Sequence, residues 1–267
     1  MKELRLSAQE LLYLCAMRGV KEVAGVEDVF LSVPEENLVG IAAQTRDSLV
    51  GKGCLKMDFD GNYSSVRETD ELIDIITRSE KRIAFFGTDG GIKKFGMIYM
   101  MPDAVCLSEC SDDLYTVQPI TAEDVPAYFA PYFLSDQVKA GQNRVTAVSA
   151  KALANAKELF ENNRIAEARK VLCEAGADDQ TAALFFASYG GKARYFSMKI
   201  DSLVPDDVYS DGMIYISDGA AALDVHFDPF DEDDVLILES TDAKTEKERF
   251  ESLLGRLQSV PVEAGDN

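Results

Sequence analysis

Tryptophan is absent from this 267-residue sequence, and histidine occurs once, as His226. A zinc site built on several histidines is therefore excluded, and so is a pair of histidines that share acid and base roles. Cysteine is sparse: the chain has five, an odd number, scattered through apolar runs (Cys15, Cys54, Cys106, Cys110 and Cys173). This pattern favours small buried thiols in a reducing compartment over a disulfide framework.

Long apolar runs and an excess of positive charge are also missing. No apolar stretch approaches the length of a membrane span, and the first residues lead into an amphipathic helix rather than a signal peptide. The chain has 27 Lys and Arg against 47 Asp and Glu, a formal net charge of −20. Such an acidic body repels phosphate backbones. We therefore expect a cytoplasmic protein that neither inserts into membranes nor binds nucleic acid.

An internal repeat is the most informative feature that is present. Gly-Met-Ile-Tyr occurs at residues 96–99 and again at 212–215. In each copy two more strand-like runs and then a helix-like stretch follow. The pattern predicts an α+β fold of two similar halves, in which helices flank a central antiparallel sheet about a pseudo-twofold axis. We place the halves at residues 1–140 and 141–267 and expect them to pack as one compact domain.

The front of the chain carries its own pattern. Ser7 and Glu10 form the signature of a capping box, and Asp60-Gly61 marks a tight turn between two short strands. The resulting order over residues 6–78, helix, helix, hairpin, helix, resembles a small winged-helix module, which would suggest DNA binding. Residues 1–78, however, contain 9 basic against 14 acidic residues, so the segment lacks the basic face that DNA binding needs.

Motifs that carry chemistry are not found. His226 lies in a strand-like run with no Ser or Cys nucleophile at a recognisable turn, and we interpret it as structural. The acidic runs at 58–62 and 228–234 lack the ligand spacing of a calcium loop, and the glycines at 87–91 lack the Lys and Ser of a P-loop. We therefore expect no catalytic residue, no metal site and no cofactor. A hydrolase that depends on His226 through an unrecognised site stays as a weaker alternative.

Aromatic residues offer the one candidate binding surface. They gather in a predicted helix over residues 123–134 that contains Pro126 and Pro131. These aromatics either pack into the core or form a partly exposed surface for a partner, held open by the prolines. The candidate partner-binding residues are Tyr128, Phe129, Tyr132, Phe133, Phe227 and Phe230.

Three further segments carry a family resemblance. They are residues 6–12 (Leu-Ser-Ala-Gln-Glu-Leu-Leu), residues 48–55 (Ser-Leu-Val-Gly-Lys-Gly-Cys-Leu) and residues 72–76 (Leu-Ile-Asp-Ile-Ile). In pattern and order they resemble the EspG family of type VII (ESX) secretion-associated proteins. Members of that family begin with a similar helix, and they consist of two like halves around a central antiparallel sheet.

This resemblance implies a function. It implies a cytosolic chaperone or adaptor, not an enzyme, that binds a helical secreted protein and shields its hydrophobic tip. The resemblance covers nearly the whole chain, and the protein would act as a monomer or a homodimer. The alternative is a winged-helix regulatory protein that binds DNA or an effector.

Overall fold

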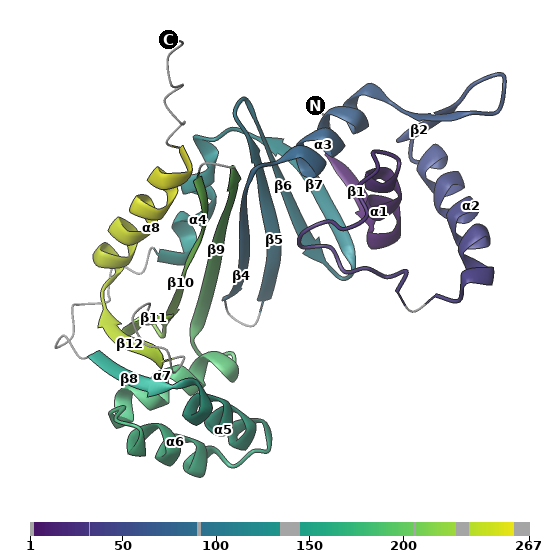
Figure 1. The fold of residues 1–267 in the computed structure, drawn as a ribbon. Helices are drawn as coiled ribbons and strands as arrows, with labels where there is room; N and C mark the ends of the chain where they lie inside the picture. Colours follow the sequence, from purple (N-terminus) through teal and green to yellow (C-terminus); the bar gives the residue numbers. More distant parts are fainter. Residues whose placement is uncertain are drawn as a thin grey trace, which may run out of the picture. The chain divides into compact units, whose positions relative to one another are not determined.

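A computed structural model describes residues 3–31, 33–89, 92–133, 145–204, 207–227 and 235–258. Ten strands in these ranges form one sheet in the order β1-β7-β6-β5-β4-β9-β10-β11-β12-β8, and β2 pairs with β3 in a separate hairpin (Figure 1). The pairs whose register is described are antiparallel. The α+β class with a large antiparallel sheet and helical flanks is thus confirmed.

The elements follow one another in two series. The first runs β1 (Leu4–Ser7), α1 (Ala8–Ala16), α2 (Glu35–Gly51), β2 (Leu55–Met57), β3 (Tyr63–Ser65), α3 (Arg67–Arg78), β4 (Lys81–Asp89), β5 (Ile92–Met101), β6 (Ala104–Ser111), β7 (Leu114–Ile120) and α4 (Asp124–Phe133). The second runs β8 (Val145–Ser149), α5 (Ala150–Glu161), α6 (Ile165–Glu174), α7 (Asp179–Tyr189), β9 (Arg194–Val204), β10 (Asp207–Ser217), β11 (Ala222–Phe227), β12 (Val235–Thr241) and α8 (Ala243–Gln258).

Internal contacts divide the chain into two compact units. The first holds residues 1–84, 94–125 and 200–209, and the second holds residues 85–93, 126–199 and 210–267. These units do not follow the halves 1–140 and 141–267, which stay a prediction from the repeat. The predicted boundary at Gly141 to Asn143 lies outside the described residues.

The core of the first unit lies between α1, α3 and the strands β5 to β7. Leu11 of α1, Leu72 of α3 and Val117 of β7 are fully buried in it. The capping box predicted at Ser7 is present, with Ser7 Oγ accepting from the Glu10 backbone N–H and the Glu10 carboxylate accepting from the Ser7 N–H. The order of helix, helix, hairpin and helix from α1 to α3 is as predicted.

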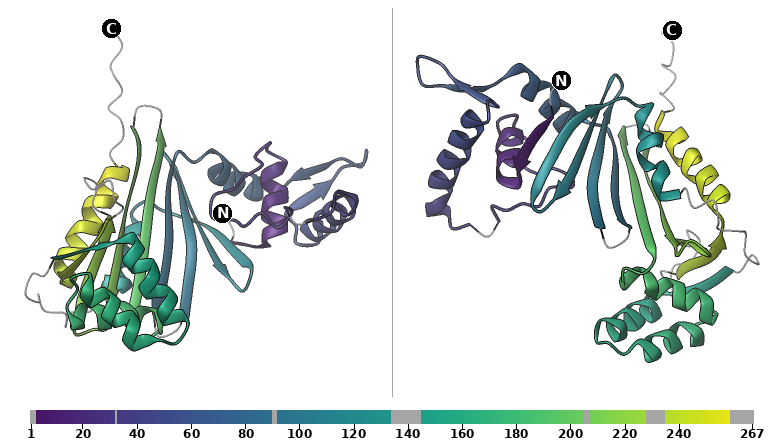
Figure 2. Two further views of the ribbon diagram at one scale, coloured as in Figure 1. Left: turned by 60° about the horizontal axis from the view of Figure 1, so that its bottom comes forward. Right: turned by 180° about the vertical axis from the view of Figure 1, so that it is seen from behind.

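In the second unit, helices cover both faces of strands β11 and β12. Leu223, Val225 and Leu238 project from one face into a core with α6 and α7. Since neighbouring residues of a strand point to opposite faces, the residues between them project the other way, toward α8. Figure 2 shows α8 and the group α5 to α7 on opposite sides of these strands.

Strands β1 and β8, at the two ends of the sheet order, were not predicted. β1 pairs with β7, and β8 pairs with β12. Each is short and ends in a serine, Ser7 or Ser149, that also caps the following helix. Because these serines predict the start of a helix, the short strand that precedes each of them is not recognised from the sequence.

Three of the five cysteines, Cys15, Cys54 and Cys106, are buried in the structure. None of the five cysteines is in a disulfide, and burial raises the pKa of Cys15 and of Cys106 to about 12. At neutral pH these two are unreactive thiols. Across the described ranges, no helix combines the length and the apolar character needed to cross a bilayer.

Candidate functional site

Two aromatic residues of α4, Phe129 and Tyr132, lie in the interior of the second unit. The rings of Phe85 on β4, Phe196 on β9 and Phe250 on α8 surround Phe129, with centroids at 5.2, 5.5 and 5.5 Å. Tyr132 stacks on Phe196 at 4.7 Å and is buried as well. These two residues therefore belong to the core, which corrects the hypothesis that they form an exposed surface.

The other residues of that hypothesis are left as a prediction. Tyr128 is half-buried, and its ring packs edge-on against Phe85 at 5.4 Å. The side chains of Phe133 and Phe227, and all of Phe230, lie outside the described residues.

Exposed apolar side chains gather instead at the β2–β3 hairpin. Met57 is 58% exposed, and Phe59 at the turn is fully exposed. Within the turn, Asp58 Oδ1 accepts from the backbone N–H groups of Asp60 at 2.9 Å and of Asn62 at 2.8 Å. The hydrogen bonds from Asn62 lower the pKa of Asp58. The hairpin thus holds an apolar tip in solvent between charged neighbours.

The cations that DNA binding would need are engaged within the first unit. The Arg46 guanidinium donates to Asp47 at 3.0 Å and lies over the Tyr63 ring at 4.5 Å. Lys52 Nζ binds the buried carboxylate of Glu10 at 2.6 Å. An arginine or a lysine already paired with a carboxylate offers little to a phosphate, so this geometry weighs against the DNA-binding alternative.

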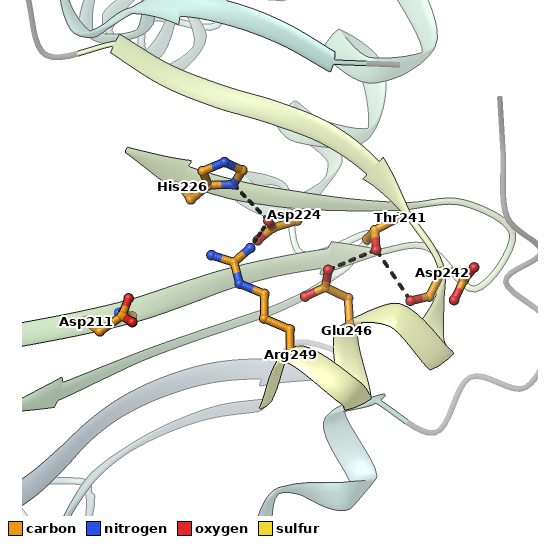
Figure 3. A network of polar contacts seen from close by, with 8 residues as sticks. Asp211, Asp224, His226, Thr241, Asp242, Glu246 and Arg249 are labelled. Carbon is orange, nitrogen blue, oxygen red and sulfur yellow. Dashed lines mark hydrogen bonds and ion pairs between the residues drawn. The ribbon is translucent and has the colours of Figure 1, made fainter. Parts of the chain in front are cut away.

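A polar cluster lies on the α8 side of β11 and β12. At its centre is Asp224, whose side chain is 4% exposed. Its Oδ2 atom lies 2.8 Å from His226 Nδ1 and also forms an ion pair with Arg249 of α8 (Figure 3). Burial lowers the pKa of Arg249, an effect that nearby Asp211 opposes. Arg249 thus supplies a positive charge to a buried carboxylate.

A second buried carboxylate belongs to the same cluster. Glu246 of α8 is 1% exposed, and its Oε1 accepts from the Thr241 hydroxyl at 2.9 Å. Burial raises the pKa of Glu246 from its ordinary value of 4.5 to about 7, although the bond from Thr241 works in the opposite direction. Glu246 Oε2 and Asp224 Oδ1 are both buried without a hydrogen-bond donor. Both carboxylates are therefore incompletely satisfied.

The cluster can hold a cation but lacks the parts of a hydrolytic triad. Asp224, His226 and Glu239 each offer one ligand atom, and these atoms lie within 4.8 Å of one another. Among the described residues, no Ser, Thr or Cys donates a hydrogen bond to His226. An Asp–His pair without such a nucleophile does not form an acylating site.

The cluster was missed from the sequence although part of its signal was visible. Asp224 and His226 stand two apart in a strand, so they share a face, and an aspartate between Leu223 and Val225 interrupts an apolar run. Glu239 and Arg249 could not be assigned to the cluster from the sequence. Their positions beside Asp224 depend on how β12 and α8 pack against β11.

Comparisons with known proteins bear on the fold. No protein-family model matches the sequence, and no curated protein matches it. Among solved structures, the chain is similar to the type VII secretion system chaperone EspG5 of Mycobacterium tuberculosis, solved in complex with the PE25–PPE41 dimer. The match has a TM-score of 0.57 and 10% sequence identity and covers 98% of each chain. The likeness is one of fold over 98% of each chain, and EspG5 is described as a chaperone.

Proposed function

We propose that this protein is a secretion-associated chaperone that binds a helical secreted protein and shields its hydrophobic tip. One observation carries the proposal: the fold is similar to that of EspG5 over 98% of both chains, and EspG5 was solved with its PE25–PPE41 partner. At 10% identity the client of this chain is expected to be a different protein, of the same general helical kind.

The β2–β3 hairpin supports the proposal. A protein that shields apolar surface needs apolar anchors of its own inside a polar rim. Phe59 and Met57 supply such anchors, and Asp58 and Asp60 flank Phe59 in the sequence. We therefore assign the hairpin tip as one contact for the client.

The charge of the chain fits the same role. A formal net charge of −20 keeps a protein soluble while it exposes apolar side chains. Shielding a client by binding is an equilibrium effect that stabilises whatever state is bound, so it requires neither a nucleotide nor a catalytic residue.

Co-expression tests the proposal. The chain is produced together with each small helical secreted protein encoded beside its gene, and complexes are measured by size-exclusion chromatography with light scattering. We expect a complex of defined stoichiometry with one of these proteins, and we expect that protein to aggregate when it is produced alone. If none of them forms a complex, the proposal is wrong.

A pair of variants tests the contact at the hairpin. Phe59→Ser removes an apolar anchor at a fully exposed site, so it should weaken the complex by about tenfold without loss of folding. Val39→Ser is the matched control, since Val39 is 79% exposed and belongs to α2, outside the β2–β3 hairpin. If the two variants bind the client with equal affinity, the hairpin tip is not part of the binding surface.

A further inference from the structure

The polar cluster beneath α8 contains more carboxyl groups than cationic side chains. It brings together Asp224, Glu239 and Glu246 with Arg249 and His226. Asp224 Oδ1 is buried and has no donor, although the other oxygen of that carboxylate is engaged by His226 and Arg249. A buried carboxylate oxygen without a partner is costly, and a bound cation would satisfy it.

Strand geometry places three ligand-bearing residues on one face. Asp224 of β11 lies directly opposite Glu239 of β12 in the antiparallel register. His226 stands two residues after Asp224, so its side chain leaves the same face of the sheet. Opposed residues of an antiparallel pair have Cβ atoms about 5 Å apart, which lets both carboxylates reach one point.

The distances are close to those of a coordination site. The three ligand atoms lie within 4.8 Å of one another, and the ion would replace the hydrogen bond of 2.8 Å between His226 Nδ1 and Asp224 Oδ2. Ligands bound at roughly 2.1 Å in a tetrahedron stand roughly 3.4 Å apart. Side-chain movements on the order of 1 Å, with no change of the backbone, therefore suffice to close the site.

We propose that Asp224, His226 and Glu239 bind one divalent first-row transition ion, with Zn²⁺ as the representative, and leave its fourth position to water. One imidazole nitrogen with two carboxylate oxygens suits this class of ion, whereas Ca²⁺ and Mg²⁺ prefer oxygen alone. Arg249 stays on Asp224 as an outer partner that orients the carboxylate. The ion would tie β11 to β12 at the face that α8 covers. This inference is independent of the chaperone proposal.

The single histidine makes the site directly observable. Protein without a histidine tag is stripped with EDTA and titrated with ZnCl₂, while NMR follows the ring C–H signals of His226, the one histidine in the chain. We expect these signals to change until one equivalent has been added and then to stay constant, and we expect calorimetry to give one ion per chain. Signals that do not change through one equivalent would overturn the proposal.

Variants separate this site from other sites that could take up zinc. His226→Gln and Glu239→Gln change partly exposed residues, and each should weaken Zn²⁺ binding at least about tenfold. Glu248→Gln on α8 makes the same charge change at an exposed position and should bind like the unaltered protein. Circular dichroism checks that each variant is folded, and a second ligand variant keeps the test decisive if the first does not fold. Unchanged binding in either ligand variant that is folded, or binding that is lost only in Cys110→Ser, would overturn the assignment.

Discussion

Glu10 and Glu246 are both buried carboxylic acids, and their surroundings give them opposite pKa shifts. Burial raises the pKa of both side chains. For Glu10 this effect is outweighed by bonds from Lys52, Ser7 and Ser48, so that its pKa is lowered. Glu246 accepts one hydrogen bond, from Thr241, and this bond lowers the pKa by less than burial raises it. The pKa of Glu246 therefore rises to about 7. The pKa values of the two glutamates thus shift in opposite directions because of the donors that the fold brings to them.

Glu246→Gln should make stability less dependent on pH. The pKa of Glu246 is 4.5 when the chain is unfolded and about 7 when it is folded. The contribution of Glu246 to stability is complete below pH 4.5 and is lost as the pH rises to 7. The reason is that the carboxyl group loses its proton at a lower pH in the unfolded chain than in the folded chain. The loss is about 1.4 kcal/mol per pH unit and levels off at about 3 kcal/mol above pH 7.

Urea unfolding in EDTA measures this difference. The Glu246→Gln variant should be more stable than the unaltered protein by about 3 kcal/mol at pH 8 and by less than about 1 kcal/mol at pH 5. Glu248→Gln, at an exposed position, should show no such trend. A stability gain from Glu246→Gln that is the same at both pH values would contradict the raised pKa.

At the scale of elements, the second Gly-Met-Ile-Tyr run begins with glycine for a steric reason. Gly212 lies in β10, and a Cβ atom there would stand 2.6 Å from the carbonyl oxygen of Met198 in β9. Backbone, unlike the end of a flexible side chain, cannot move aside easily. The glycine therefore permits β10 to approach β9 closely at this point.

Gly212→Ala should destabilise the protein by about 1–3 kcal/mol, since the added methyl group forces the two strands apart. Gly40→Ala is the opposite case, because Gly40 is exposed within α2 and has no atom within 4 Å of an added Cβ. That change should stabilise the protein by about 0.5–1 kcal/mol through helix propensity. Thermal and urea unfolding measure both, and the same sign for the two variants would refute this account.

Most elements were predictable because their signals are local. Apolar periodicity, the capping box at Ser7 and the Asp60-Gly61 turn act within a few residues, and the structure agrees with the elements that they predict. Strand ends were less predictable: glycine at the start of the glycine-rich run 87–91 favours a turn, yet Gly87 lies in β4. A strand continues as long as its neighbour pairs with it, and that neighbour is distant in the sequence.

At the scale of the whole molecule, charge is the dominant physical property. If every one of the 27 Lys and Arg residues paired with a carboxylate, about 20 of the 47 Asp and Glu residues would still be unpaired. Their mutual repulsion opposes the compact state and is weakened by salt.

Salt should therefore stabilise the protein. Raising NaCl from about 20 mM to about 300 mM shortens the Debye length from about 20 Å to about 6 Å, so repulsion between distant carboxylates is screened more than the close ion pairs are. We expect Tm, measured by differential scanning calorimetry at pH 8, to rise by about 2–4 °C. A fall in Tm would mean that the ion pairs outweigh the excess negative charge.

Composition and local pattern were enough to establish the α+β class, most helices and strands, and the lack of a recognisable catalytic motif. The position of the α4 aromatics was not predictable, because an aromatic run can be core or surface, and Phe129 is buried by Phe196 and Phe250, which lie far along the chain. The cluster of Asp224, Glu239 and Arg249 depends likewise on packing, since each residue comes from a different element. Contacts between distant segments form only when the chain folds, so short-range sequence patterns do not predict them.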